Sequence, residues 1–447
     1  MGDEVINSGI FRMVNGSIET IAIPGGPANG AGPGVTFKSL LNLIAFNDDN
    51  LTATRVQLMG PGINVSNDSG LYLTWFGGFQ LGIREGNAAP GVPGTSCDGF
   101  GFTMPLLGSD GQIAFDVSLK GATDVSSSRW RGWPGAVTSL AKEGDPTPEG
   151  GVFGGLTPYF WTMSLSDSGA AFRSPIETVT GAKQAIWHAS GGAANTVSSL
   201  AVEGDLGPLG FYETIGSQVP NTSGDGRTIF TARFAAFGLP DAEDSAILSV
   251  ASGEAAAVLL CEGDWAYGFG AGVEIDDVAS FDNYAAFATN DTGWTLIRAQ
   301  VRGPGINKTN TIGFWTIDPD GDIHYVGRTG VFLSFDGEPV RLVETISPQF
   351  GVGPQSGRRS SINNRGDVAL AIRFTNGDAA VVVAQLPSAR PGDINLDGAV
   401  DAKDLAMLLG AWGTNGPVGT GGDVDLDGDT DGQDLGALLG AWGPCRN

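Results

Sequence analysis

The sequence is poor in the side chains that most catalytic metal and nucleophile motifs require. Its 447 residues include 2 histidines, His188 and His324, and neither lies near a second His or a Cys in the sequence. His-Glu-x-x-His, Gly-x-Ser-x-Gly and phosphate-binding-loop motifs are all absent. These absences exclude most metallohydrolases and serine hydrolases. They leave open enzymes that use a pair of carboxylates, because any two acids can converge in a fold.

Cysteine, basic residues and long apolar runs are also scarce. Three cysteines (Cys97, Cys261 and Cys445) form no Cys-x-x-Cys pair and allow at most one disulfide. Lys and Arg number 24 against 49 Asp and Glu, and the resulting net charge of −25 repels nucleic acid. No apolar run is long enough to span a membrane, so we expect no membrane insertion. Met1–Glu4 lacks the pattern of a signal peptide, and we expect that a leader has been removed.

A repeat occupies most of the chain. A Glu-Gly-Asp or Glu-Gly-Asn corner recurs at spacings of 58, 60 and 59 residues, and a strand that ends in Phe recurs at spacings of 57, 58 and 57. Two markers that keep one period predict a repeat array. Fainter copies at both ends bring the number to six, with Pro24-Gly-Gly26 in place of the first corner. The corner glycines are Gly86, Gly144, Gly204 and Gly263, and the marker residues are Phe115, Phe172, Phe230 and Phe287.

The repeat predicts a mainly β fold for residues 1–387. Short β-rich runs are separated by Gly, Asp, Asn and Pro turns, and a period near 58 residues suits a four-stranded blade with one long loop. We therefore expect a β-propeller-like domain of six blades, with a seventh, composite blade as the alternative. The final run, 379–386, has no partner of its own in this scheme and would close the ring, because an open ring exposes edge strands.

This part of the chain resembles bacterial secreted proteins with tandem Asn-x-x-Gly-x-Val-Ala-Phe repeats, which often carry a C-terminal sorting or docking tail. The resemblance covers roughly residues 9 to 386 and implies an architecture rather than an activity. The segments that carry it are Asn363–Leu370, Ser166–Phe172 and Ser109–Phe115.

Two features of the repeats have both a structural and a functional interpretation. The paired acids of Glu143-Gly-Asp145 and its copies could bind a cation or a sugar, but a glycine with positive φ beside a self-capping Asp also makes a turn. We favour the turn. Trp130 and Trp133 could stack on a glycan ligand of the propeller, but we favour a place for them in the core.

After a linker at 388–392, the segment 393–447 contains two acidic loops in the pattern of a calcium-binding loop. Each has oxygen side chains at positions 1, 3, 5, 9 and 12, a glycine at 6 and a backbone carbonyl at 7, with Asp at position 12 where Glu is usual. Without a cation the clustered carboxylates repel one another, so we predict two Ca²⁺ sites. Their residues are Asp393, Asn395, Asp397, Ala399, Asp401 and Asp404 in the first loop, and Asp423, Asp425, Asp427, Asp429, Asp431 and Asp434 in the second.

A short amphipathic helix is predicted after each loop. Apolar residues fall at i, i+3, i+4 and i+7, which places them on one helical face. We expect these two faces to be buried against each other in a small all-α unit. The residues are Leu405, Leu408, Leu409 and Trp412 after the first loop, and Leu435, Leu438, Leu439 and Trp442 after the second.

The paired loops and helices of residues 393–443 resemble a type I dockerin. The resemblance implies two bound Ca²⁺ ions and a cohesin-like or cell-surface receptor as partner. Loop positions 10 and 11 differ between the copies, Ala402-Lys403 against Gly432-Gln433, so they form no shared recognition pair. Because extracellular calcium is plentiful enough to fill even weak sites, we expect a secreted or surface-displayed protein.

The sequence therefore favours a non-catalytic binding or scaffold protein, attached through its calcium-dependent tail. The alternative is a dockerin-bearing glycoside hydrolase or lyase that degrades polysaccharides with a carboxylate pair. Its catalytic residues are not assigned by any motif.

Overall fold

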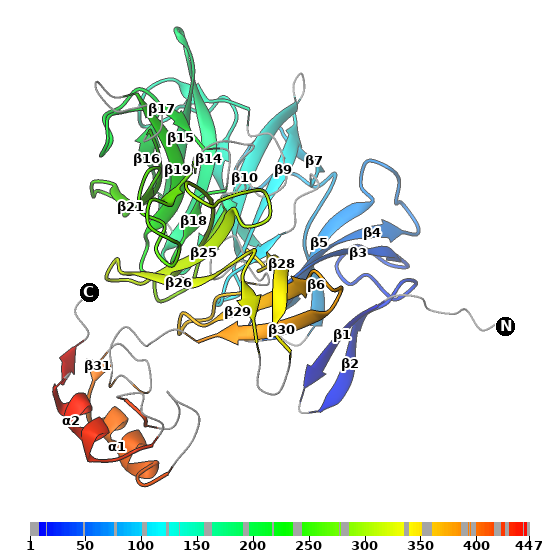
Figure 1. Ribbon diagram of the computed structural model, residues 1–447. Helices are drawn as coiled ribbons and strands as arrows, with labels where there is room; N and C mark the ends of the chain where they lie inside the picture. Colours follow the sequence, from blue (N-terminus) through cyan, green and yellow to red (C-terminus); the bar gives the residue numbers. More distant parts are fainter. Residues whose placement is uncertain are drawn as a thin grey trace.

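The computed structural model is mainly β, with two short helices near the C-terminus (Figure 1). It describes residues 9–444 except 15, 48–49, 76–77, 101–104, 122–124, 134, 156–162, 191–195, 217–218, 236–243, 277, 279–285, 335–338, 351–359, 386–391, 393, 395–398, 415–421, 425–428 and 441. Neither helix has the length and the apolar character that crossing a lipid bilayer requires, within this described part of the chain. Most of the linker and Cys445 lie outside the described residues.

Six antiparallel sheets follow one another along the chain, after an N-terminal hairpin. We number them sheet 1 to sheet 6. The hairpin is β1 (Ile10–Val14) and β2 (Ser17–Ala22); sheet 1 is β3 (Thr36–Phe46), β4 (Thr52–Met59), β5 (Ser69–Trp75) and β6 (Gly78–Arg84); sheet 2 is β7 (Ser96–Gly99), β8 (Leu106–Leu107), β9 (Ile113–Lys120), β10 (Val125–Trp133) and β11 (Ala136–Lys142); sheet 3 is β12 (Val152–Phe153), β13 (Met163–Ser166), β14 (Gly169–Thr178), β15 (Gly181–Ser190) and β16 (Val197–Val202).

Sheets 4 and 5 have the same plan as sheets 2 and 3. Sheet 4 is β17 (Phe211–Ile215), β18 (Asn221–Thr222), β19 (Thr228–Ala235), β20 (Ser245–Val250) and β21 (Ala257–Cys261); sheet 5 is β22 (Glu274–Ile275), β23 (Ala286–Thr289), β24 (Thr295–Arg302), β25 (Ile312–Ile317) and β26 (Ile323–Arg328); sheet 6 is β27 (Phe332–Leu333), β28 (Arg341–Ser347), β29 (Val368–Phe374) and β30 (Ala379–Ala384). In sheet 6, β28, β29 and β30 correspond to the first, second and third strands, because the corner residue Gly330 donates to the carbonyl of Val343 in β28.

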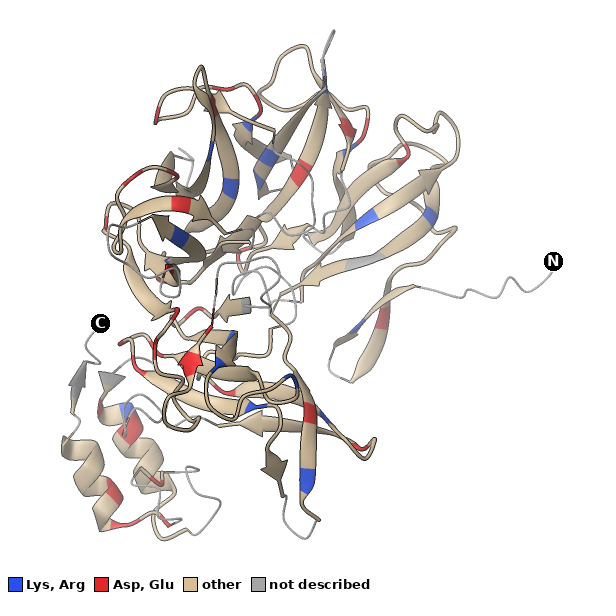
Figure 2. Ribbon diagram, turned by 45° about the horizontal axis from the view of Figure 1, so that its top comes forward, with Lys and Arg blue, Asp and Glu red and all other residues tan. Residues whose placement is uncertain are grey.

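The sheets are arranged around a common centre in the manner of a propeller (Figures 1 and 2). In sheets 2 to 5 a short strand pairs with the long second strand, and the short strands β8, β13, β18 and β23 of successive sheets contact one another. This confirms the predicted β-repeat architecture. One expectation was wrong: β30 at residues 379–384 does have a partner, because it pairs with β29 along one edge.

The Glu-Gly-Asp corners are turns that connect each sheet to the next. Their glycines have φ between 82° and 89°, the left-handed region that glycine enters without strain. The N–H of Gly144 donates to the carbonyl of Phe153 at 2.8 Å, and the N–H of Gly25 donates to Phe37 at 2.7 Å. Pro24-Gly-Gly26 therefore does stand in place of the first corner, and the interpretation of the corners as turns is confirmed.

The corner glutamates have a role that the sequence did not reveal. Their carboxylates accept hydrogen bonds from the third strand of the same sheet, so each corner is fixed to the sheet that it leaves. Glu143 Oε2 accepts from Ser127 N at 3.0 Å, and Glu203 Oε2 accepts from Gln184 N at 2.7 Å. The buried Glu262 accepts from Ser245 Oγ at 2.9 Å and from Arg302 Nη1 at 2.8 Å.

Replacing Glu262 by Ala is expected to destabilise sheets 4 and 5. The change removes a charged acceptor and leaves Ser245 and Arg302 without it, a loss of about 1.5–3 kcal/mol for bonds to a charged group. Denaturant unfolding measures the loss. Glu254→Ala is the matched control, since this exposed glutamate makes only a surface ion pair with Arg227. Equal free energies of unfolding for Glu262→Ala and Glu254→Ala would contradict the stabilising role of the Glu262 carboxylate.

In sheets 1 to 5 the third strand contributes one large side chain to the core. These side chains are at most 1% exposed and include Trp130, which confirms its predicted place in the core. The same prediction was wrong for Trp133, which lies at the end of the same strand and is 39% exposed. The equivalent core residues are Tyr72, Trp130, Trp187, Leu248 and Trp315.

Candidate metal centre in the C-terminal unit

Two helices begin immediately after the acidic loops. They are α1 (Ala402–Gly410) and α2 (Gly432–Gly440), and a two-stranded sheet of β31 (Ala399–Val400) and β32 (Gly443–Pro444) joins the start of the unit to its end. Asp401 caps α1: its Oδ1 accepts from Lys403 N at 2.7 Å, and its own N–H donates to Asp404 Oδ2 at 2.8 Å. A carboxylate at the N-terminus of a helix is also favoured by the helix dipole.

The second loop repeats this geometry. Asp431 Oδ1 accepts from Gln433 N at 2.7 Å, and Asp431 N donates to Asp434 Oδ2 at 2.7 Å. Asp434 Oδ1 also accepts from Val424 N at 2.6 Å, which ties the start of the loop to the helix. The position-12 aspartates of both loops, Asp404 and Asp434, are fully buried.

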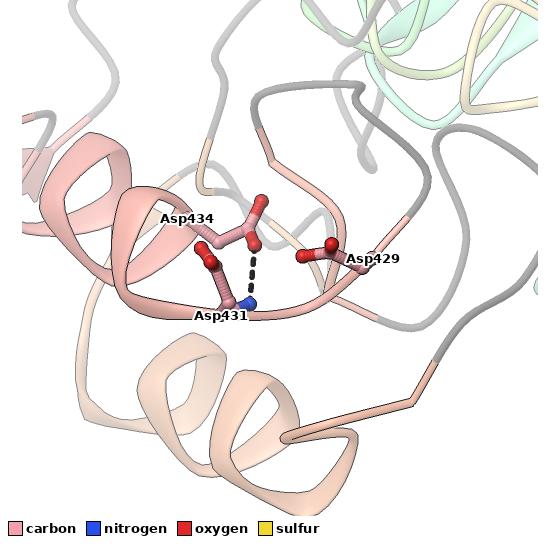
Figure 3. Close-up of side chains that lie close together, drawn as sticks. All are labelled: Asp429, Asp431 and Asp434. Carbon is pink, nitrogen blue, oxygen red and sulfur yellow. Dashed lines mark hydrogen bonds between the residues drawn. The ribbon is translucent and has the colours of Figure 1, made fainter.

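Three carboxylates of the second loop converge. One oxygen each of Asp429, Asp431 and Asp434 lie within 4.8 Å of one another (Figure 3). At this separation two unit charges repel by about 3.5 kcal/mol if the effective dielectric constant is about 20. The all-oxygen donor set is the one that hard cations such as Ca²⁺ prefer. A bound cation would offset the repulsion, so the residues present fit the predicted ion.

The structure describes part of each predicted site. Asp401 and Asp404 are brought together in the first loop, and Ala399 lies in β31. Asp423 is buried at the start of the second loop. Asp429 was assigned only a carbonyl by the loop pattern, but its side chain also joins the cluster. The predicted ligands that lie outside the described residues are Asp393, Asn395, Asp397, Asp425 and Asp427.

The packing of the two helices differs from the expectation. Leu408 and Leu438 are fully buried and pack with Val400 and Val424, but the rest of the predicted apolar faces is only partly covered. Two helices of nine residues cross over a small area, so each buries one leucine completely. Four large side chains, two from each half of the unit, are 47–54% exposed, and we refer to them together as the Leu-Trp patch: Leu409, Trp412, Leu439 and Trp442.

The two halves of the unit are cross-connected. Val400 of the first loop pairs with Gly443, which follows α2. Thr430 of the second loop pairs with the segment that follows α1: Gly413 N donates to its carbonyl at 2.8 Å, and its own N–H donates to Thr414 O at 3.1 Å. Each loop is therefore completed by the end of the opposite half.

Among the described residues, no further group of His, Cys, Asp and Glu side chains could hold a metal. His324 Nε2 lies 3.0 Å from Asp318 Oδ2, and His188 is buried with its pKa lowered by desolvation and by nearby Arg131. We therefore interpret both histidines as structural residues rather than as metal ligands. The thiol of Cys97 is buried, and this burial raises its pKa to about 11.

Comparison with solved structures gives matches at low similarity. The Trypanosoma rangeli sialidase in complex with sialic acid matches with 12% identity, a TM-score of 0.30 and coverage of 85% of this chain and 57% of its own. A hypothetical protein from Leishmania major matches with 10% identity, a TM-score of 0.21 and coverage of 67% and 88%. A Bombyx mori GH32 β-fructofuranosidase mutant in complex with sucrose matches with 11% identity, a TM-score of 0.22 and coverage of 75% and 72%.

The chain spans little more than half of the length of the trypanosomal sialidase. No curated protein matches the sequence. One family model matches three overlapping stretches, residues 2–129, 80–282 and 184–388, which together cover the hairpin and all six sheets. The chain therefore belongs to DUF7453, a family of unknown function.

Proposed function

We propose that this protein is a secreted or surface-displayed, non-catalytic binding or scaffold protein, held in place by a calcium-loaded, dockerin-like C-terminal unit. The observation that supports it best is the convergence of Asp429, Asp431 and Asp434 at the start of α2. At this separation the three carboxylates repel one another, and a bound cation would offset that repulsion. Calcium at extracellular concentration would fill both loops, so the tail is ordered outside the cell.

The Leu-Trp patch is the docking face in this proposal. It contains no charged side chain, and the two helices that carry it contribute Leu409 and Leu439 at equivalent positions. Large apolar side chains that stay half-exposed mark interaction surfaces, and aromatic residues dominate the energetics of such surfaces. The partner would be a receptor with a complementary apolar groove, in the cell envelope or on a cohesin-like module.

The docking face is tested by replacing Leu409 and Leu439 with Glu. Both side chains are half-exposed, so the unit is expected to stay folded while retention on the envelope fraction of the producing cells falls at least tenfold, about 1.4 kcal/mol or more. Circular dichroism in calcium checks the fold, and sedimentation with washed envelopes checks retention. Val65→Glu is the control, since Val65 is an exposed apolar residue of the repeat body. Undiminished, calcium-dependent retention of the double variant would contradict docking through this face.

A further inference from the structure

The repeat has a fixed rule for packing one sheet on the next. The large residue of each third strand lies in a cluster with residues of the preceding sheet: Trp130 with Leu71 of sheet 1, and Trp315 with Ile247 of sheet 4. The residue just before it in the strand faces the other way, toward the following sheet. Ile247 itself immediately precedes Leu248 and shows this. Each third strand therefore has one face for each neighbour.

The N-terminal hairpin follows the same rule, although it is only half of a sheet. A register shift between Ile10 and Phe11 matches the shifts at Ile186/Trp187 and Ile247/Leu248, and the Gly25 corner follows β2 as it follows every fourth strand. β1 is thus a third strand and β2 a fourth strand. Ile10 packs in one cluster with Tyr72 of sheet 1, as the rule requires.

Phe11 occupies the position of the buried tryptophans, yet it is 54% exposed. Met13 and Ile18 are directly paired and are 69% and 72% exposed. Met13 lies two residues after Phe11, so all three side chains lie on one face of the hairpin. This is the face that in every other repeat packs on the preceding sheet.

Sheet 6 has the matching open face. Val382 pairs with Leu370, four residues after Gly366, just as Leu248 pairs with Phe230, four residues after Gly226. Val381 is therefore the equivalent of the fully buried Ile247, but it is 81% exposed, and Val383 is 59% exposed. These valines lie on the face that in sheets 1 to 5 packs on the following sheet.

We propose that the hairpin β1–β2 packs its Phe11 face on the open face of sheet 6 and thereby closes the ring. The ring then has seven positions: the six sheets and, in the seventh, the hairpin alone. Seven third strands, β5, β10, β15, β20, β25, β30 and β1, follow one another around it, and the contact of Phe11 with Val381 is the one sheet-to-sheet contact of this series that the structure leaves open.

Three observations favour the hairpin of the same chain as the occupant. It is already anchored on sheet 1 through Ile10 and Ala22, and both views show it beside β29 and β30 (Figures 1 and 2). The two faces are the complementary halves of one interface that the repeat forms elsewhere. The charges beside them are neutralised in pairs, Arg12 with Glu19 on the hairpin and Arg373 with Glu344 on sheet 6, so no net charge opposes contact.

A cross-link between the two faces tests the closure. The repeat register places Met13 opposite Val383, each two residues beyond the contact of Phe11 with Val381. The full-length chain carries Met13→Cys and Val383→Cys, with Cys261 and Cys445 replaced by Ser. A short bifunctional thiol reagent is expected to give a link within one chain, at a rate independent of protein concentration. The matched control pairs Val383→Cys with Val65→Cys, an exposed position in a turn before sheet 1's third strand.

The expected yield for the test pair exceeds that of the control pair by on the order of tenfold or more, because contact raises the effective concentration of the second thiol. Links found only between two chains would overturn the proposal, since a second copy would then cover the face. Equal yields for both pairs would overturn it as well. In an independent measurement, Phe11→Asp is expected to speed amide hydrogen exchange in β30 while sheets 2 to 4 stay protected. Unchanged exchange in β30 would count against closure.

Discussion

Removal of calcium from the full-length protein is expected to unfold α1 and α2 while the six sheets persist. Without a cation, Asp429, Asp431 and Asp434 would repel one another by about 3.5 kcal/mol per pair at an effective dielectric constant of about 20, whereas four of the described residues form the buried core of the unit. We therefore expect the folding of the unit to be coupled to the ion. Hydrogen exchange, followed peptide by peptide in a chelator, distinguishes the two regions in one sample.

Replacing Asp434 by Ala should reproduce the chelator's effect in the presence of calcium. Asp434 holds both Val424 and Asp431 by backbone hydrogen bonds, so its loss also disconnects the loop from α2. Asp320→Ala in an exposed turn of sheet 5 is the control for the loss of one charge. Titration calorimetry should show heat of calcium binding for the control and a reduced stoichiometry for Asp434→Ala. Retention of protected helices in the chelator would refute the coupling.

Replacing Asp116 by Ala is expected to cost the repeat body about 3–5 kcal/mol of stability. Asp116 and Arg129 are both buried, with Arg129 Nε 3.2 Å from Asp116 Oδ1. Arg129 also donates to the carbonyl of Arg173 at 2.6 Å and lies over the ring of Phe172. Burial lowers the pKa of Arg129, but the guanidinium remains charged, so loss of Asp116 leaves an unpaired cation between sheets 2 and 3.

Urea unfolding measures this loss. Glu19→Ala is the control, because it removes a similar ion pair, with Arg12, on the exposed hairpin, where such pairs contribute about 1 kcal/mol or less. The double variant Asp116→Ala, Arg129→Ala should recover part of the stability, since it removes the stranded charge as well. If Asp116→Ala and Glu19→Ala unfold at the same urea concentration, the buried ion pair of Asp116 with Arg129 does not stabilise the fold.

The repeat and its turns could be predicted from the sequence because they depend on local chemistry. The corner glycine at Gly144 needs a positive φ whatever surrounds it, and the 58-residue period sets the number of strands between corners. The loop pattern of the tail also predicted acids that converge, because calcium loops fix their ligands by spacing along the chain, and the two Ca²⁺ sites stay a prediction. Asp431 and Asp434 lie together at the start of α2, as the loop pattern predicted.

Features that depend on contacts between residues far apart in the sequence could not be predicted from the sequence. Nothing near Glu262 in the sequence indicates that Ser245 and Arg302 bond to it, because the three residues lie in three different strands or turns. The helical period predicted that Leu408 and Leu409 are both buried against the second helix, which is wrong for Leu409, since it is 54% exposed. Whether the facing helix is large enough to cover both is a question of area, and here it covers only Leu408.

The backbone hydrogen bonds that connect the two halves of the C-terminal unit have one more consequence. Val400 pairs with Gly443, and Gly413 donates to the carbonyl of Thr430, so each half of the unit is held in part by backbone hydrogen bonds from the other. If both loops bind Ca²⁺ as we propose, an ion in one loop would help to order the other, and attachment through the tail would be lost cooperatively when calcium is removed.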